Sequence, residues 1–597
     1  NALNDNTTGA SNVAVGANAL DANTTGGSNT GIGKGCLGAN TTGTANFAGG
    51  TAALESNTTA SNNTAVGYFA LLSNTTGASN VAVGAYALDA NTTANNNTAI
   101  GYASLSANTT GSENTALGVN SLLSNTTGHH NQAIGYNCMD ANTVGRHNTA
   151  IGRDALGANT TGSLNISIGS YTLSNQTGAD NNIAVGYGAL YSNTTGANNV
   201  GVGVSVLVAN TTGANNVAVG HNALDANTTG GQLVAVGYGA LSANTTADSN
   251  VAVGDNSLND NTTGSANTAL GRSALASNTT ASNNTAVGRS AMSSNTTGTE
   301  NTAVGRSALQ NNTTSSYNTA VGDQALNGNT TGTRGVAVGN NALTANSTGS
   351  YNTACGDSAM GSNTTGSNNV AVGRNTMASS TTGSSNTACG TSALYANTGG
   401  QYNTASGDSA LVSNTTGSYN TAVGRHAMYS NTTSNDNTAV GHQALYTNTT
   451  ATDCVAVGYK ALYSSNANDC TAVGDNALYA NTTGDVNTAV GERSLLSCTT
   501  GRINTAIGGN AMDGLTTGEN NTSIGYEAGD ACTTGSNNVF VGYYAGRNQG
   551  NNDNELWIAR GSQGANNAAV WIYGNSAGSL YQGNNQNVWS TTSDRRL

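Results

Sequence analysis

Glycine returns at a fixed interval along almost the whole chain. Every seventeenth residue from Gly16 to Gly458 is glycine, and after one missing residue the interval resumes from Gly474 to Gly542. If the residue four places before each glycine is position one, the unit reads Asn, Thr or Val, Ala, Val or Ile, Gly, two variable residues, Ala or Ser, Leu, two variable residues, Asn-Thr-Thr-Gly and two variable residues. There are 32 such units. A strict short repeat restricts the chain to folds in which successive units stack on one another.

The content of one unit excludes a helical repeat. A helical unit needs apolar residues spaced by three and four over about three turns. This unit has two short apolar clusters separated by glycine and by Asn-Thr-Thr-Gly, which are turn residues. The chain has no proline, and proline within sheets is confined to edges and bulges. We therefore predict an all-β protein, a parallel β-solenoid or β-roll of about 32 coils with two short strands in each 17-residue coil.

The repeat also indicates a core. Position nine is leucine in most units, and all six methionines fall there; because methionine conserves the volume of leucine, position nine is expected to be buried. Position four should join it, so that one unit buries Val66 and Leu71. Position three is nearly always alanine and points to the opposite strand face. We expect this alanine face, which includes Ala65, to pack against other copies of the chain around a threefold axis, and the variable Phe69 to face water.

Two asparagines recur in each unit, at positions one and twelve. Stacked units align them, and aligned asparagines bond along a stack through their side-chain amides. Position twelve also begins the recurring Asn-Thr-Thr, which is an N-glycosylation sequon. We interpret this triplet as a turn with a ladder residue, while glycosylation in a host that modifies such proteins stays open.

The repetition ends near residue 554. This divides the chain into a solenoid shaft, residues 1–554, and a non-repetitive segment, residues 555–597. The last two units lack leucine at position nine and have Gly529 and Gly546 instead. Alternating apolar residues in the final segment predict β-strands, so we expect a small β cap. All three tryptophans lie in it: Trp557, Trp571 and Trp589.

The stretch Asn-[Thr/Val]-Ala-[Val/Ile]-Gly, seen as NVAVG at Asn12 and NTAIG at Asn97, resembles the repeats in the head domains of trimeric autotransporter adhesins. The resemblance implies a left-handed parallel β-roll that assembles as a parallel homotrimer. The unit here is longer because of its Asn-Thr-Thr-Gly turn, and it looks more like the arrays of phage and bacterial "tail fiber domain" proteins. The resemblance covers residues 1 to about 554.

The final stretch WSTTSDRRL resembles the junction before the intramolecular chaperone of endosialidase-type phage tailspikes and fibres. In that family a C-terminal chaperone drives trimerisation and then cuts itself off near a Ser-Asp pair. Ser593 and Asp594 match the pair and are the candidate autocleavage junction, and the resemblance implies a following lysine and a chaperone domain beyond Leu597. We also expect the natural protein to extend upstream, because residues 1–11 correspond to positions seven to seventeen of a unit.

Residues that could carry other chemistry are few. No phosphate-binding loop, nucleophile elbow or metalloprotease motif occurs, and no carboxylate cluster recurs in one place, which argues against a sugar-cleaving tailspike or another enzyme. The histidines are scattered without the spacing of metal ligands, so we expect solvated surface histidines and neither metal nor cofactor. They are His129, His130, His147, His221, His426 and His442.

Two further patterns involve cysteine and tyrosine. Cys454 and Cys470 lie in adjacent units and could form a disulfide, although replacement of other small residues is the favoured interpretation for all eight cysteines. Tyrosine recurs at position ten of four successive units. Stacked there, it forms an aromatic ladder that we interpret as structural, with sugar binding as an alternative. The ladder residues are Tyr429, Tyr446, Tyr463 and Tyr479.

Charge and hydropathy limit the partners. The net charge is −13 and no basic stripe for nucleic acid exists, and no apolar run reaches the roughly 20 residues that a membrane span requires. We therefore expect an extracellular structural fibre shaft, on a virion tail or a bacterial surface, that presents or spaces a binding tip. The alternative is a cell-surface adhesin filament whose solenoid surface binds host glycans or matrix.

Overall fold

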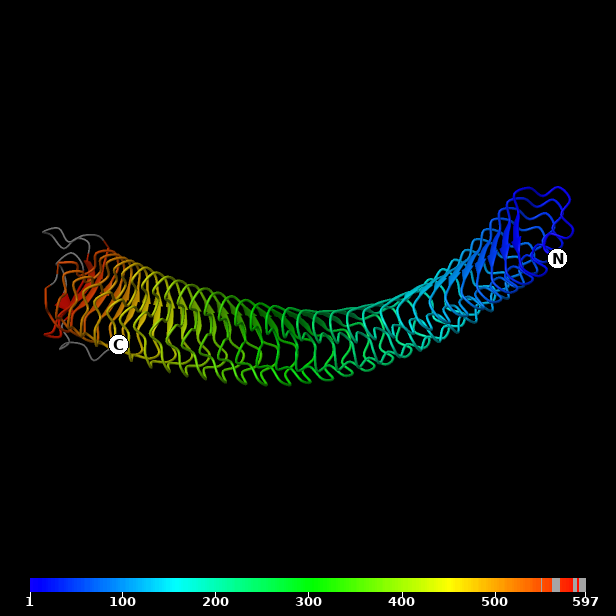
Figure 1. Cartoon of the computed structure of the whole chain (residues 1–597). Coiled ribbons are helices and arrows are strands. Elements are labelled where there is room, and N and C mark those ends of the chain that lie inside the picture. The colour runs from blue at the N-terminus through cyan, green and yellow to red at the C-terminus, as the bar shows by residue number, and fades with distance from the viewer. Residues whose placement is uncertain (549, 561–569, 583–587, 590–597) are drawn as a thin grey trace, which may run out of the picture. The chain divides into compact units, whose positions relative to one another are not determined.

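A computed structural model of the chain describes residues 1–548, 550–560, 570–582 and 588–589. The chain forms two compact units, Asn1–Glu300 and Asn301–Leu597. Within each unit it winds as a parallel β-solenoid in which every coil contributes one short strand to a common sheet (Figure 1). The described residues include no helix, which confirms the predicted all-β class.

In the first unit, each strand has three residues and pairs in parallel with the strand of the next coil. The partners are 17 residues apart, as Val13 and Thr30 show. The strands are β1 (Val13–Val15), β2 (Thr30–Ile32), β3 (Phe47–Gly49), β4 (Thr64–Val66), β5 (Val81–Val83), β6 (Thr98–Ile100), β7 (Thr115–Leu117), β8 (Gln132–Ile134), β9 (Thr149–Ile151), β10 (Ile166–Ile168), β11 (Ile183–Val185), β12 (Val200–Val202), β13 (Val217–Val219), β14 (Val234–Val236), β15 (Val251–Val253), β16 (Thr268–Leu270) and β17 (Thr285–Val287).

The second unit continues the same pattern within itself. Where one residue is missing before Cys470, Val455 pairs with Thr471 and the strands stay aligned, so the shortened part is a turn, as predicted. The strands are β18 (Thr302–Val304), β19 (Thr319–Val321), β20 (Val336–Val338), β21 (Thr353–Cys355), β22 (Val370–Val372), β23 (Thr387–Cys389), β24 (Thr404–Ser406), β25 (Thr421–Val423), β26 (Thr438–Val440), β27 (Val455–Val457), β28 (Thr471–Val473), β29 (Thr488–Val490), β30 (Thr505–Ile507), β31 (Thr522–Ile524) and β32 (Val539–Val541).

Each coil has one strand, so the prediction of two was wrong. In one coil, Phe69, Leu71 and Ser79 have positive φ angles of 59°, 53° and 59°, and left-handed residues interrupt extended backbone. Positions six to seventeen therefore fold as turns. Gly67 has a φ of 139°, and a Cβ there would lie 2.6 Å from the carbonyl carbon of Gly84 in the next coil. Position five requires glycine both for its backbone angle and for this close approach.

The core of each coil is formed by alanine at position three and leucine at position nine. Ala65 and Leu71 are fully buried, whereas Val66 is 37% exposed. The prediction that position four is buried was therefore wrong, and so was the prediction that the alanine face packs on other copies, because it is enclosed in its own coil. The limited space inside a coil explains why alanine, and not valine, faces the core. At Gly201, which replaces that alanine, a Cβ would lie 3.3 Å from Cδ1 of Leu190, which leaves no room for a larger side chain.

The predicted asparagine ladders are confirmed. At position twelve, Nδ2 of Asn40 donates to Oδ1 of Asn23 over 2.7 Å and to the carbonyl of Gly43 over 3.1 Å. At position one, the backbone N–H of Asn46 donates to Oδ1 of Asn29 over 3.0 Å. These side chains are buried, so hydrogen bonds along the stack satisfy polar groups that water does not reach.

The predicted cap extends the last coil. Strand β33 (Leu556–Ala559) pairs in parallel with β32, and β34 (Val570–Gly574), β35 (Leu580–Gln582) and β36 (Val588–Trp589) follow as antiparallel neighbours. Glu555 occupies the place of the position-one asparagine. Its N–H donates to Oδ1 of Asn538 over 2.8 Å, and its carboxylate accepts from Nε1 of Trp557 over 2.8 Å. The ladder ends here because the next strand, β34, is antiparallel, so no further coil supplies an N–H at this position.

Packing explains why leucine disappears from position nine in the last two coils. Phe540 occupies position three, where almost all other coils have alanine, and it is buried. A Cβ on Gly529 would lie 2.7 Å from the Phe540 ring, and a Cβ on Gly546 would overlap it. One large side chain has therefore replaced two leucine side chains.

Candidate functional site

An uncharged, largely apolar stripe lies on the outer face of the strands in each unit. We define the outer stripe as the side chains of positions two and four. Position two is Val, Ile, Phe, Thr or Gln, and neither position ever carries Asp, Glu, Lys, Arg or His. Position four is aliphatic in every coil with four exceptions. The exceptions are Gly49, Cys355, Cys389 and Ser406.

Many large apolar members of the outer stripe are well exposed, from 36% for Val202 to 57% for Val15. Single exposed apolar residues are common, but an extended contiguous patch marks an interaction surface. In the first unit they are Val13, Val15, Ile32, Phe47, Val66, Ile100, Leu117, Ile151, Ile166, Ile168, Val202, Val217, Val219 and Leu270. In the second unit they are Val304, Val321, Val336, Val338, Val370, Val372, Val423, Val455, Ile507 and Ile524.

The cysteines divide by position. The thiols of Cys355 and Cys389 lie on the outer stripe and are exposed, whereas Cys138 is enclosed in a coil and burial raises the pKa of its thiol to about 12. Cys454 and Cys470 are buried and are not joined by a disulfide. The hydrogen bond with the Cys470 thiol and burial both raise the pKa of Cys454, so this thiol stays protonated.

The predicted tyrosine ladder is present. Successive ring centroids from Tyr429 through Tyr446 and Tyr463 to Tyr479 are 5.1, 5.0 and 5.1 Å apart, and the ring planes differ by 16° or less. The rings are half-buried, and most of their faces are covered by one another. Nζ of Lys460 lies 5.5 Å from the Tyr463 ring centroid and 6.0 Å from that of Tyr479, so a cation lines the edge of the ladder.

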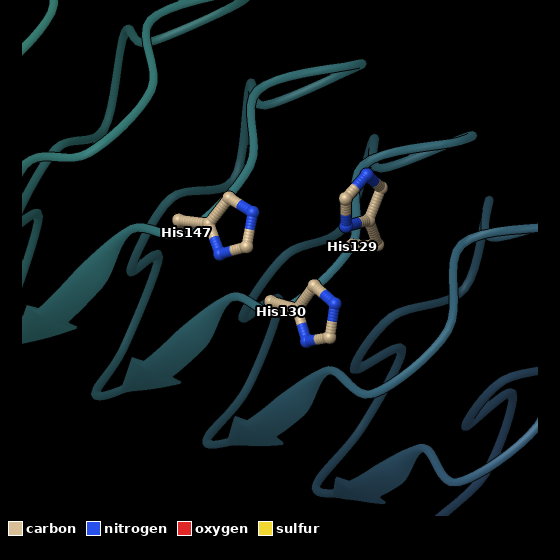
Figure 2. A group of neighbouring side chains, drawn as sticks. All are labelled: His129, His130 and His147. Carbon is tan, nitrogen blue, oxygen red and sulfur yellow. The ribbon is translucent and has the colours of Figure 1, made fainter.

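Sequence reasoning missed a histidine cluster. The fold brings His129, His130 and His147 together at the turn that precedes β8 and β9 (Figure 2). Their possible ligand atoms all lie within 4.8 Å of one another, so the expectation of scattered histidines does not hold here. Burial and the neighbouring His130, His147 and Arg146 lower the pKa of His129, while Glu113 raises it. The repeat period could have revealed the cluster, because His130 and His147 are 17 residues apart and both occupy position seventeen of their units.

The sequons lie where a glycan has no room. Except at the exposed Asn6, the asparagine of Asn-Thr-Thr is buried, and its Nδ2 atom donates hydrogen bonds, as in Asn74 to Asn57 and to Gly77, both over 2.9 Å. Because N-glycosylation modifies this nitrogen, the sequons with a buried asparagine are inaccessible in the folded coils. The threonines continue the ladder, as Oγ1 of Thr75 donates to the carbonyl of Thr92 over 3.0 Å.

Ser593 and Asp594, the candidate autocleavage junction, lie outside the described residues. Within the described ranges, no helix has the length and hydropathy that a bilayer crossing requires. Compared with known proteins, the chain matches no family model and no curated protein.

Proposed function

We propose that this chain is the shaft of a homotrimeric extracellular fibre, similar to a tail fibre, that presents or spaces a binding tip. The observation that carries the proposal is the outer stripe. A surface that carries an aliphatic side chain in all but four coils and a charged side chain in none is suited to a partner with the same repeat, and a second copy of this chain offers one. The proposed role is structural rather than catalytic.

The stripe also replaces the alanine face as the trimer contact. Parallel copies in register would place like residues at the same height, for example Val217 and Val219 against their equivalents. β-branched side chains at such a contact exclude water and need no compensating charges. Around a threefold axis each stripe would contact the stripes of two other copies. A monomer or a dimer in solution would contradict the proposed trimer.

Two natural thiols test whether the stripe is covered. Cys355 and Cys389 are exposed in the single chain, so in a monomer they should react with a maleimide as quickly as in the denatured protein. In the proposed fibre they should react only after dissociation. Cys138 is the internal control, because its coil encloses it in either state. Rapid labelling of Cys355 and Cys389 in the native protein at micromolar concentration would refute the covered stripe.

The same thiols report register. Copies aligned in parallel and in register should give Cys355–Cys355 and Cys389–Cys389 cross-links on mild oxidation, and a mixed Cys355–Cys389 product indicates slipped copies. Near-identical coils make slippage inexpensive, so we propose that residues 555–597 set the register. A chain truncated after Asn554 should then yield mixed cross-links or insoluble material. In-register cross-links in the truncated chain would contradict this role.

Association can be blocked without disturbing a coil. Val219 lies 37% exposed on the stripe, so a Val219→Glu substitution should leave the coil folded and weaken assembly, because burying an unpaired charge is costly. His221→Glu, two residues further along at an exposed variable position, is the matched control. Light scattering should show the mass of three 59.0 kDa chains for the native protein and for the control.

A second candidate function is an adhesin filament that binds an acidic glycan. A shallow groove beside the tyrosine ladder is lined by Tyr459, Lys460, Tyr479 and Arg493, which combines aromatic edges with two cations. Lys460→Ala together with Arg493→Ala should abolish retention on an acidic polysaccharide column without altering the mass of the assembly. Equal retention of the variant and the native protein would exclude this groove.

A further inference from the structure

We propose that His129, His130 and His147 form a binding site for a divalent late transition-metal ion of the zinc class. This site lies on a turn of the coil, apart from the outer stripe, and does not depend on the proposed fibre. Imidazole nitrogen is a preferred ligand for zinc, copper and nickel. Three protein ligands with a water molecule in the fourth position are an established arrangement for zinc.

The rings are placed to converge. The rings of His130 and His147 stack with centroids 4.8 Å apart and planes within 11°. The ring of His129 stands at 78° to one and 83° to the other, with centroids 4.9 and 5.4 Å away. In a tetrahedral zinc site with bonds of about 2.0–2.1 Å, ligand nitrogens are separated by roughly 3.4 Å. The possible ligand atoms are within 4.8 Å, so side-chain rotation of these surface rings closes the difference.

A carboxylate orients one of the ligands. Nδ1 of His130 lies 2.8 Å from Oε2 of Glu113, which occupies position seventeen of the preceding coil. A histidine whose Nδ1–H donates to a carboxylate presents Nε2 as its metal-binding atom. Such carboxylate partners fix the tautomer and ring orientation of metal ligands. Glu113 is therefore a positioning residue of the site, and its charge partly offsets that of the ion and of Arg146 nearby.

The backbone holds the ligands in place before any ion binds. The N–H of His147 donates to the carbonyl of His129 over 3.1 Å, and the N–H of His130 donates to Ser112 over 3.1 Å. His130 and His147 both have left-handed φ angles, of 58° and 57°, set by the repeat. The ligands thus come from two adjacent coils with a fixed separation, and an ion would clamp those coils together.

The test uses the full chain, purified without a polyhistidine tag, with Zn²⁺ in calorimetry and Co²⁺ in absorption spectroscopy. We expect one tight ion per chain and a tetrahedral Co²⁺ spectrum. Each of His129→Ala, His130→Ala and His147→Ala should weaken binding at least tenfold. His221→Ala, which removes an exposed histidine stacked on Tyr238, should change nothing.

Glu113→Gln separates positioning from ligation. It should weaken Zn²⁺ binding by roughly 10–100-fold while the Co²⁺ spectrum keeps its shape, as expected when an orienting partner is lost. The variants should fold, because other coils carry Ala78 at position sixteen and Leu164 at position seventeen, and circular dichroism verifies it. Equal Zn²⁺ binding by the native chain and a folded triple-alanine variant, or no binding by the native chain, would overturn the proposal.

Discussion

Ser380 lies at the ladder position directly after Asn363, and Oδ1 of Asn363 has no hydrogen-bond partner among the described residues. In most other coils this oxygen accepts from the asparagine of the next coil, as Asn346 does from Asn363 over 2.8 Å. The hydroxyl of Ser380 is also buried without a partner. One short side chain therefore interrupts the ladder on both of its sides.

The first prediction is that Ser380→Asn stabilises the protein. The new Nδ2 would donate to Asn363, and the new Oδ1 would accept from Asn397. Satisfying a buried polar group is worth about 1–3 kcal/mol. The gain should appear as slower amide exchange in coil 369–385 and as a higher denaturant midpoint. Ser379→Asn, at the neighbouring variable position, is the control, and an equal effect of both changes would contradict the ladder argument.

The second prediction uses the exchange seen at Phe540. Ala65→Phe alone should destabilise its coil by about 1–3 kcal/mol through overpacking. Adding Leu54→Gly and Leu71→Gly, which reproduce the places of Gly529 and Gly546, should recover part of that loss. Thr76→Ser, at an exposed position of the same coil, should change stability little. If the triple variant is no more stable than Ala65→Phe, then large and small residues do not compensate across these positions.

The third prediction concerns the period. Deleting Asn199–Asn215 removes one whole coil and allows β11 to pair with β13 in the native register, so the protein should fold and assemble. Deleting only residues 199–206 places turn residues against strand residues and should cause aggregation. Sedimentation and far-ultraviolet circular dichroism compare the two proteins. Similar behaviour of both deletions would be incompatible with a 17-residue structural unit.

The fourth prediction is a pair of opposite pH dependences. Burial, with a contribution from Asp154, raises the pKa of Asp140. The folded state therefore binds the Asp140 proton more tightly than the unfolded state does. Protonated Asp140 stabilises the fold below the ordinary pKa of about 3.9, and this stabilisation is lost as pH rises through the raised pKa of the folded state. Asp140→Asn should therefore stabilise the protein at neutral pH and have little effect below about pH 4.

Asp323 provides the opposite sign. A hydrogen bond from Arg306 lowers the pKa of Asp323, and two contacts of 2.8 Å join the side chains. The ionised Asp323 stabilises the fold above the ordinary pKa of an aspartate, and this stabilisation is lost as pH falls through the lowered pKa of the folded state. Asp323→Asn should slightly destabilise the protein at neutral pH, with the difference disappearing in acid. Both variants are compared with the native protein by their denaturant midpoints as a function of pH. If the midpoints of a variant and of the native protein differ by the same amount at every pH, the pKa shift assigned to that aspartate is refuted.

The sequence predicted the stacked coils, the buried Leu71 and the asparagine ladders, because each depends only on which residues recur at one spacing. It did not predict which side of the strand faces inward. In a strand of three residues, the side chain of position three points away from those of positions two and four. The sequence does not show which of these two faces points into the core. Burying Val66 is favoured by hydrophobicity. Where leucine fills position nine, however, the coil has room only for a small side chain such as that of Ala65, and this limit is a property of the folded chain.

The histidine cluster shows a related limit. His129 and His130 are adjacent in sequence, but His147 joins them only when coils are stacked in register. The ligand spacings of metal sites built on a single turn or loop are shorter than the 17 residues between His130 and His147. Residues that share a position in neighbouring units are the ones to compare, and the same comparison aligns Glu113 with His130.

The asparagine ladders have a mechanical consequence. Their hydrogen bonds, like those between strands, join each coil only to its neighbours and lie along the stack. A force pulling in that direction is carried by every interface, and the end coil, to which the pulled chain is attached, detaches first while the coils behind it keep their bonds. Each coil that detaches would lengthen the chain by 17 residues, or about 56 Å when extended, in place of about 4.8 Å of stack. The protein would therefore yield to tension in equal steps, each absorbing work while the remaining coils stay folded.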